Sequence, residues 1–224
     1  MPSSSSTQTA ASSASPESVV DTVVIRYFVL VDETDLLIQL VGEPIGTPRS
    51  VYDDDEASHL PDDARSEITR SVAYQQRAST DPARDPDARR EAARNAARLA
   101  AVASLHESGR LAILDLEQEE LHLVGRLTSP TSCKEYGLRF PLDPGEAACL
   151  AIAVTRGLVL ATDDTDALRA LDRHAPGHPY ERIRKLLIRA GSGGLCSPGR
   201  ANEIHREMRH LGFWDRHDPF PVGS

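Results

Sequence analysis

The sequence predicts an α/β fold with a central parallel sheet, on three observations. A helical pattern at 145–157 ends at a glycine and is followed at once by the apolar segment LVLAT at 158–162. Acidic residues come directly after it, at 163–166. A second short apolar segment, SVV at 18–20, also ends in an acid, Asp21. Helices joined to strands by tight turns form parallel sheets, and ligands bind beyond the carboxyl ends of such strands.

The remaining elements follow in chain order. Residues 23–31, VVIRYFVLV, are β-branched, so local propensity favours a strand. Residues 32–42 have helical spacing and a glycine stop, and 44–48 form a short extended piece. A helix is expected to begin at Ser50, its N-cap. Later, 111–116 is a candidate strand and 117–127 a helix.

The segment 61–109 differs in composition from the rest of the chain. It is rich in Ala, Arg and Asp, and 84–109 is expected to form one helix capped by Asp85. A solvated helix packed on one side is one interpretation, and a partner-binding helix is the other. In either case the segment is predicted to supply no site residue.

Composition limits the classes of function. The chain has 224 residues, 40% of them apolar, and a net charge of −9, which argues against a general nucleic-acid coat but allows a local basic groove. Three cysteines without C-x-x-C spacing argue against a disulfide framework or a zinc site, so a cytoplasmic setting is expected. The Ser-rich residues 1–17 suggest a disordered tail, and no segment is apolar enough to suggest a membrane span.

Three acids are placed to meet at one sheet edge. Asp21 and Asp164 each follow a predicted strand, and Glu146 opens a helix that leads back into the sheet. Clustered carboxylates without Cys or His suit a hard cation such as Mg²⁺ or Mn²⁺. Simple capping of the next helix is the alternative for the 163–166 acids.

The chain turns basic after residue 168. Between 169 and 209 it carries nine Lys or Arg and four Asp or Glu, on two predicted helices at 179–190 and 197–212. A solvated helix face and an RNA-binding surface explain this pattern equally well. The RNA-binding candidates are Arg169, Arg173, Arg182, Arg184 and Lys185.

Several motifs in order resemble the PIN domain, in the bacterial branch that has a G-E-A motif. They are SVVDT followed by IRYF, then SVYDD, LDPGEAACLAIA, LVLATDDTDALRA and a similar C-terminal helix pair. The resemblance implies a three-layer α/β/α sandwich over 18–214, with 23–28 helical, 61–109 as a helical insertion and 215–224 as a C-terminal tail. The stretch HAPGHPYE, at 174–181, stands where the family has a short strand, and its prolines predict that it does not pair.

The resemblance also implies a metal-dependent endoribonuclease, in many members the toxin of a toxin–antitoxin pair. The family's acids fall on Asp21, Asp54, Glu146 and Asp164, with Thr22 and Asp166 in supporting positions. Asp21, Glu146 and Asp164 would hold Mg²⁺ or Mn²⁺, and the partners would be RNA, an antitoxin or a second copy of the chain. The alternatives are a PIN-like binding module with a weakened site and, more remotely, a haloacid dehalogenase-like phosphatase that uses the D-T-D at 164–166.

Overall fold

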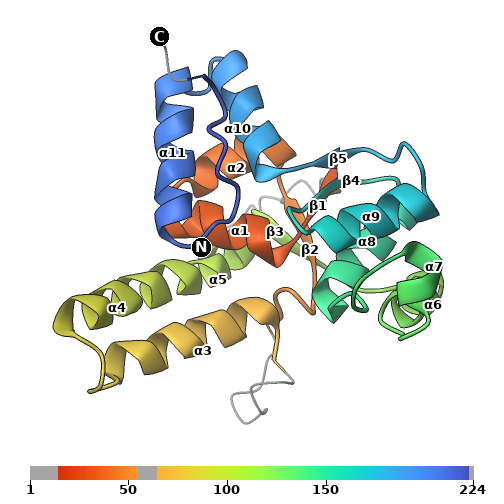
Figure 1. Cartoon of the computed structure of the whole chain (residues 1–224), viewed down its shortest axis with the longest axis horizontal. Coiled ribbons are helices and arrows are strands. Elements are labelled where there is room, and N and C mark those ends of the chain that lie inside the picture. Colours follow the sequence, from red (N-terminus) through yellow and green to blue (C-terminus); the bar gives the residue numbers. More distant parts are fainter. Residues whose placement is uncertain (1–14, 55–64, 222–224) are drawn as a thin grey trace, which may run out of the picture.

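The computed structural model describes residues 15–54 and 65–221 and has an α/β architecture (Figure 1). Five parallel strands form one sheet in the order β3-β2-β1-β4-β5. They are β1 (Ser18–Val20), β2 (Ile45–Pro48), β3 (Leu111–Leu114), β4 (Val159–Ala161) and β5 (Tyr180–Glu181). The predicted fold class is therefore correct at this level.

Helices flank the sheet in two groups, an arrangement compatible with three layers (Figure 1). One group is α6 (Gln118–Leu127), α7 (Ser132–Tyr136), α8 (Pro144–Arg156) and α9 (Thr165–His174), of which α8 packs on β1, β2 and β4. The other is α1 (Thr22–Leu30), α2 (Thr34–Val41), α10 (Ile183–Ser192) and α11 (Pro198–His210), which contact one another.

Helix α1 forms against its local propensity, as the family resemblance implied. Its apolar residues are buried on most sides of the helix, among them the β-branched Val24 and Ile25 and the aromatic Phe28. Asp21 caps the helix: its carbonyl oxygen accepts from the N–H groups of Val24 and Ile25. Tertiary burial and the cap therefore outweigh β-propensity here.

The segment 61–109 is mainly helical in its described part. Helices α3 (Glu67–Thr80) and α4 (Pro86–Ala100) form a hairpin that projects from the body of the molecule (Figure 1). The predicted cap Asp85 accepts a hydrogen bond from Ala88 N. The single helix expected over 84–109 is instead two, because the chain turns at Ala101 before α5 (Val102–Glu107).

The prediction that 174–181 does not pair was wrong. Tyr180 and Glu181 form β5, in register with Leu160 and Ala161 of β4. Pro179 is tolerated because it contributes only its carbonyl oxygen, which accepts from Leu160 N at 3.2 Å. Proline is compatible with the start of an edge strand, and β5 lies at the edge of this sheet.

Other predictions concern the ends of the described ranges. The helix expected from Ser50 does not form over 50–54, and 55–64 lie outside the described residues. Of the predicted tail 1–17, residues 1–14 also lie outside the described residues. At its end, the carbonyl oxygen of Glu17 accepts a hydrogen bond from Val159 N. Within the predicted C-terminal tail, Phe220 exchanges two hydrogen bonds with Asn202 of α11. Over 15–54 and 65–221, no helix is both long and apolar enough to cross a bilayer.

Candidate active site

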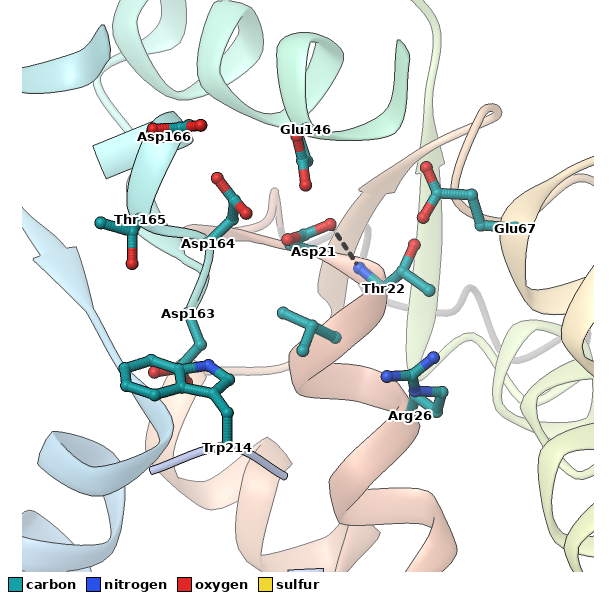
Figure 2. Close-up of a pocket in the computed structure, with 11 residues that line it drawn as sticks. Asp21, Thr22, Arg26, Glu67, Glu146, Asp163, Asp164, Thr165, Asp166 and Trp214 are labelled. Atoms are coloured by element: carbon teal, nitrogen blue, oxygen red, sulfur yellow. Dashed lines mark hydrogen bonds between the residues drawn. The ribbon is translucent and has the colours of Figure 1, made fainter. Parts of the chain in front are cut away.

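A pocket opens at the carboxyl ends of β1 and β4, where the strand order reverses. The chain leaves β1 toward β2 and leaves β4 toward β5, so the loops after these strands diverge and leave a crevice, as in other open α/β sheets. The pocket has a volume of about 450 Å³. Six carboxylates line it, and we call it the acidic pocket (Figure 2): Asp21, Glu67, Glu146, Asp163, Asp164 and Asp166.

Asp21 is fixed at the centre of this edge. Its backbone N–H donates to Ala161 O at 3.0 Å, which ties the end of β1 to β4. One carboxylate oxygen accepts from Thr22 N and the other from the Thr162 hydroxyl, each at 2.7 Å. The residue is 3% exposed, and burial raises its pKa from 3.8 to about 7. Asp21 is therefore an acid that titrates near neutrality.

Glu146 faces Asp21 from the first turn of α8 (Figure 2). Asp143 and Glu146 form a capping box, in which Glu146 Oε2 accepts from Asp143 N at 3.2 Å. Burial, together with the charges of Asp164 and Asp21, raises the pKa of Glu146 to about 8. Two acids from separate elements of the same pocket thus keep their protons to a higher pH than ordinary carboxyl groups do.

The three acids after β4 have three different environments. Asp164 caps α9, accepting from Ala167 N at 2.6 Å, and its carboxylate points into the acidic pocket (Figure 2). Asp163 points away from the other acids and accepts from Ile183 N and from Arg182 Nε, which anchors the start of α10. Asp166 pairs with Arg169 at 2.6 Å. Asp164 therefore both caps α9 and lines the acidic pocket.

Asp54, expected to support the site, lies outside the acidic pocket. Its carboxylate pairs with His106 at 3.0 Å and with Arg49 at 3.6 Å, near α5. Glu67, at the start of α3, lines the pocket instead (Figure 2). The segment 61–109 was predicted to supply no site residue, but through Glu67 it contributes an acid to the acidic pocket.

Glu67 lies against the start of α8. Burial raises the pKa of its carboxyl. A β-carbon at Gly145 would overlap the Glu67 carboxylate, so the glycine of the G-E-A motif leaves the space that this side chain uses. The buried Thr22 hydroxyl makes no hydrogen bond within 3.5 Å among the described residues, although it is close enough to Glu67 to favour that side chain's ionised form.

Sequence reasoning also missed two residues that line the acidic pocket. Arg26 faces it from the second turn of α1, and Trp214 borders it from the segment after α11 (Figure 2). Trp214 is 55% exposed and carries the Arg182 guanidinium 5.1 Å from its ring centre. That it is the only tryptophan in the chain, close to the basic helices, was the available signal.

The five predicted RNA-binding cations all make internal contacts. Arg169 and Arg182 pair with acids of the pocket, and Lys185 pairs with Glu181. The guanidinium groups of Arg173 and Arg184 donate to the backbone carbonyls of Glu135 and Asp218. Their role in RNA binding stays a prediction.

The donor set of the acidic pocket suits a hard divalent cation. Glu146 and Asp164 each use one carboxylate oxygen in a cap, and the other oxygen has no hydrogen-bond donor among the described residues. Oxygen donors without Cys or His are those that Mg²⁺ and Mn²⁺ accept. As the side chains stand, however, no three His, Cys, Asp or Glu residues in 15–54 and 65–221 are drawn together closely enough to hold an ion.

Comparisons with protein families, with curated proteins and with solved structures find no match for this chain.

Proposed function

We propose that the chain is a metal-dependent endoribonuclease of PIN type. One observation carries the proposal: acids from four separate segments line the switch point of a parallel sheet, and burial raises the pKa of two of them, the buried Asp21 and the half-buried Glu146. Such an arrangement is unfavourable for folding unless a cation or a proton offsets the charge, and it is typical of functional sites. The order of motifs described above supports the PIN assignment.

Four acids are assigned roles. Asp21, Glu146 and Asp164 would hold Mg²⁺ or Mn²⁺, and Glu67 takes the supporting role that the sequence suggested for Asp54. When bound, the cation would offset the carboxylate charge and lower the pKa of water for phosphodiester hydrolysis. Thr22 and Thr162 hold Asp21 in place, and the caps of α8 and α9 orient Glu146 and Asp164.

A binding module without catalysis is the second candidate. The observation that favours it is that the described acids are not drawn into a ligand set as they stand. A missing strand at 174–181, as predicted from its prolines, would also have favoured a weakened PIN-like fold, but β5 is present there.

One assay separates the candidates. The protein is incubated with single-stranded RNA or with para-nitrophenyl phosphate, each with Mn²⁺, with Mg²⁺ or with chelator. The ribonuclease proposal predicts RNA cleavage that needs the metal and no phosphomonoester hydrolysis. RNA that is bound but not cleaved would favour the binding module, and hydrolysis of the monoester alone would favour a phosphatase.

A further inference from the structure

A second groove continues from the acidic pocket along α3. It has a volume of about 720 Å³ and shares Thr22, Arg26 and Glu67 with the acidic pocket, so the two form one continuous depression. We call it the α3 groove. Its wall on the hairpin side is one face of α3, where Arg70, Tyr74 and Arg77 line it.

The charge of the lining reverses between the two depressions. The acidic pocket has six carboxylates and one arginine, whereas the α3 groove has three arginines and two carboxylates, Glu67 and Asp143. Among the described residues, neither Arg26 nor Arg70 makes an ion pair within 4.0 Å or a side-chain hydrogen bond, although both lie near enough to Glu67 to favour its ionised form. Their donors therefore remain available to an anion that enters the groove.

Tyr74 adds an exposed aromatic ring to this wall. It is 52% exposed, and Arg84 steadies it, with the guanidinium 5.9 Å from the ring centre and a hydrogen bond of 3.3 Å to the hydroxyl. Arg70, Tyr74 and Arg77 are spaced i, i+4, i+7 and so lie on one side of α3, over roughly 10 Å of helix. Along α3, an arginine, an aromatic ring and a second arginine thus follow one another in the direction that leads away from the acidic pocket.

We propose that the α3 groove holds the single strand of RNA that flanks the phosphate bound in the acidic pocket. The inference rests on the proposed ribonuclease function, because it assigns the path of that enzyme's substrate. The carboxylates of the acidic pocket repel a phosphodiester chain unless cations neutralise its next phosphates, and Arg26 stands at the junction to do so. Arg70 follows, and the ring of Tyr74 offers a stacking surface that only an unpaired base can reach.

The test is RNA binding in chelator, where a metal-dependent nuclease does not cut. The probe is a fluorescein-labelled oligouridine of about 12 nucleotides, followed by fluorescence anisotropy. The variants are Arg70→Ala and Tyr74→Ala, both at exposed positions. The matched control is Arg94→Ala, which removes an exposed arginine from α4 of the same hairpin and does not line the groove. Thermal melts verify that all three variants fold.

We expect Arg70→Ala and Tyr74→Ala each to raise the Kd by about tenfold, while Arg94→Ala leaves it unchanged. Loss of a phosphate contact at Arg70 should also lower the slope of log Kd against log salt by about 0.7. Tyr74→Ala should leave that slope unchanged. An unlabelled RNA duplex should compete less well than unlabelled single strand.

Wild-type Kd in both groove variants would overturn the inference, and so would equal losses in all three variants. A wild-type chain that binds no single-stranded RNA would overturn it as well, and would leave the groove to a protein partner. The ribonuclease proposal is judged separately, by cleavage in Mn²⁺. Cleavage with unaffected groove variants refutes only the RNA path, and groove-dependent binding without cleavage refutes only the catalytic proposal.

Discussion

Asp21 and Glu146 are carboxyl groups held where an ionised carboxylate is costly. Asp21 has two hydrogen-bond donors that favour its ionised form, yet burial dominates and its pKa rises to about 7. Glu146 is affected by the charges of Asp164 and Asp21 in addition to burial. Two neighbouring acids that retain protons near neutrality make the stability of the chain depend on pH.

The residue Asp21 gives a prediction with a definite sign. Between its ordinary pKa of 3.8 and about 7, the unfolded chain has released a proton that the folded chain still holds. Folding therefore becomes less favourable as the pH rises through that window. Asp21→Asn removes this penalty and keeps a carbonyl oxygen for Thr22 N. Denaturation in chelator should show the variant gaining stability relative to wild type between about pH 5 and about pH 8; an equal difference at both pH values contradicts the raised pKa.

A second prediction at this scale compares Glu67 with Asp54. Glu67 lines the acidic pocket, and Asp54 pairs with His106 outside it. Glu67→Gln should lower the kcat for RNA cleavage by about tenfold or more, because it removes a charge beside the proposed ligands. Asp54→Asn should leave kcat unchanged. Equal losses of kcat in both variants, or a loss only in Asp54→Asn, would contradict this prediction. Either result would restore Asp54, the acid of the motif V-Y-D-D, as the supporting residue of the site.

At the scale of elements, strong local patterns were predictive. The G-E-A helix, the strands that come just before Asp21 and Thr162, and the cap at Asp85 all follow from short-range signals. Helix α1 and β5 did not follow from local propensity, because burial and an edge position decide them.

The site was predictable in part for the same reason. The carboxyl ends of strands are readable in sequence, so Asp21, Glu146 and Asp164 could be grouped. Glu67 could not, because only the packing of α3 beside α8 brings it to the pocket, and its local sequence differs little from other helix starts. Trp214 and Arg26 depend on tertiary packing in the same way.

One contact between elements fixes the helix that carries Glu146. Glu120 of α6 is buried and accepts from Arg156 and Thr155 of α8, each at 2.7 Å. Hydrogen bonds from Arg156 are the main reason that the pKa of Glu120 falls to about 2. The clamp joins α6 to the carboxyl end of α8.

Glu120→Gln should therefore lower the free energy of unfolding by about 2 kcal/mol near neutral pH, because charge-assisted bonds become neutral ones. The contribution is present above the ordinary pKa of 4.5 and is lost as the pH falls toward 2. Urea denaturation should show the difference from wild type shrinking at about pH 3. Glu119→Gln, at the exposed neighbouring position, is the control. A difference that does not depend on pH would contradict the clamp.

For the whole molecule, the separation of charge is the main feature. A chain with a net charge of −9 concentrates carboxylates at one sheet edge and places arginines in the groove beside it. The acidic pocket would repel nucleic acid in the absence of a cation, and the α3 groove would attract it. Metal and RNA are therefore expected to bind to adjoining parts of one depression.

The most direct measurement of the central claim is cleavage of a single-stranded RNA in Mn²⁺ by wild type, Asp164→Asn and Asp172→Asn. Asn caps a helix about as well as Asp, so Asp164→Asn keeps α9 while removing a carboxylate from the acidic pocket. Asp172→Asn makes the same change at an exposed position of α9. We predict chelator-sensitive cleavage by wild type and Asp172→Asn, its loss in Asp164→Asn, and a melting temperature of Asp164→Asn in chelator at or above that of wild type, because repulsion with the neighbouring acids is relieved. Full chelator-sensitive cleavage by Asp164→Asn, or no cleavage by wild type with either Mn²⁺ or Mg²⁺, would contradict the account.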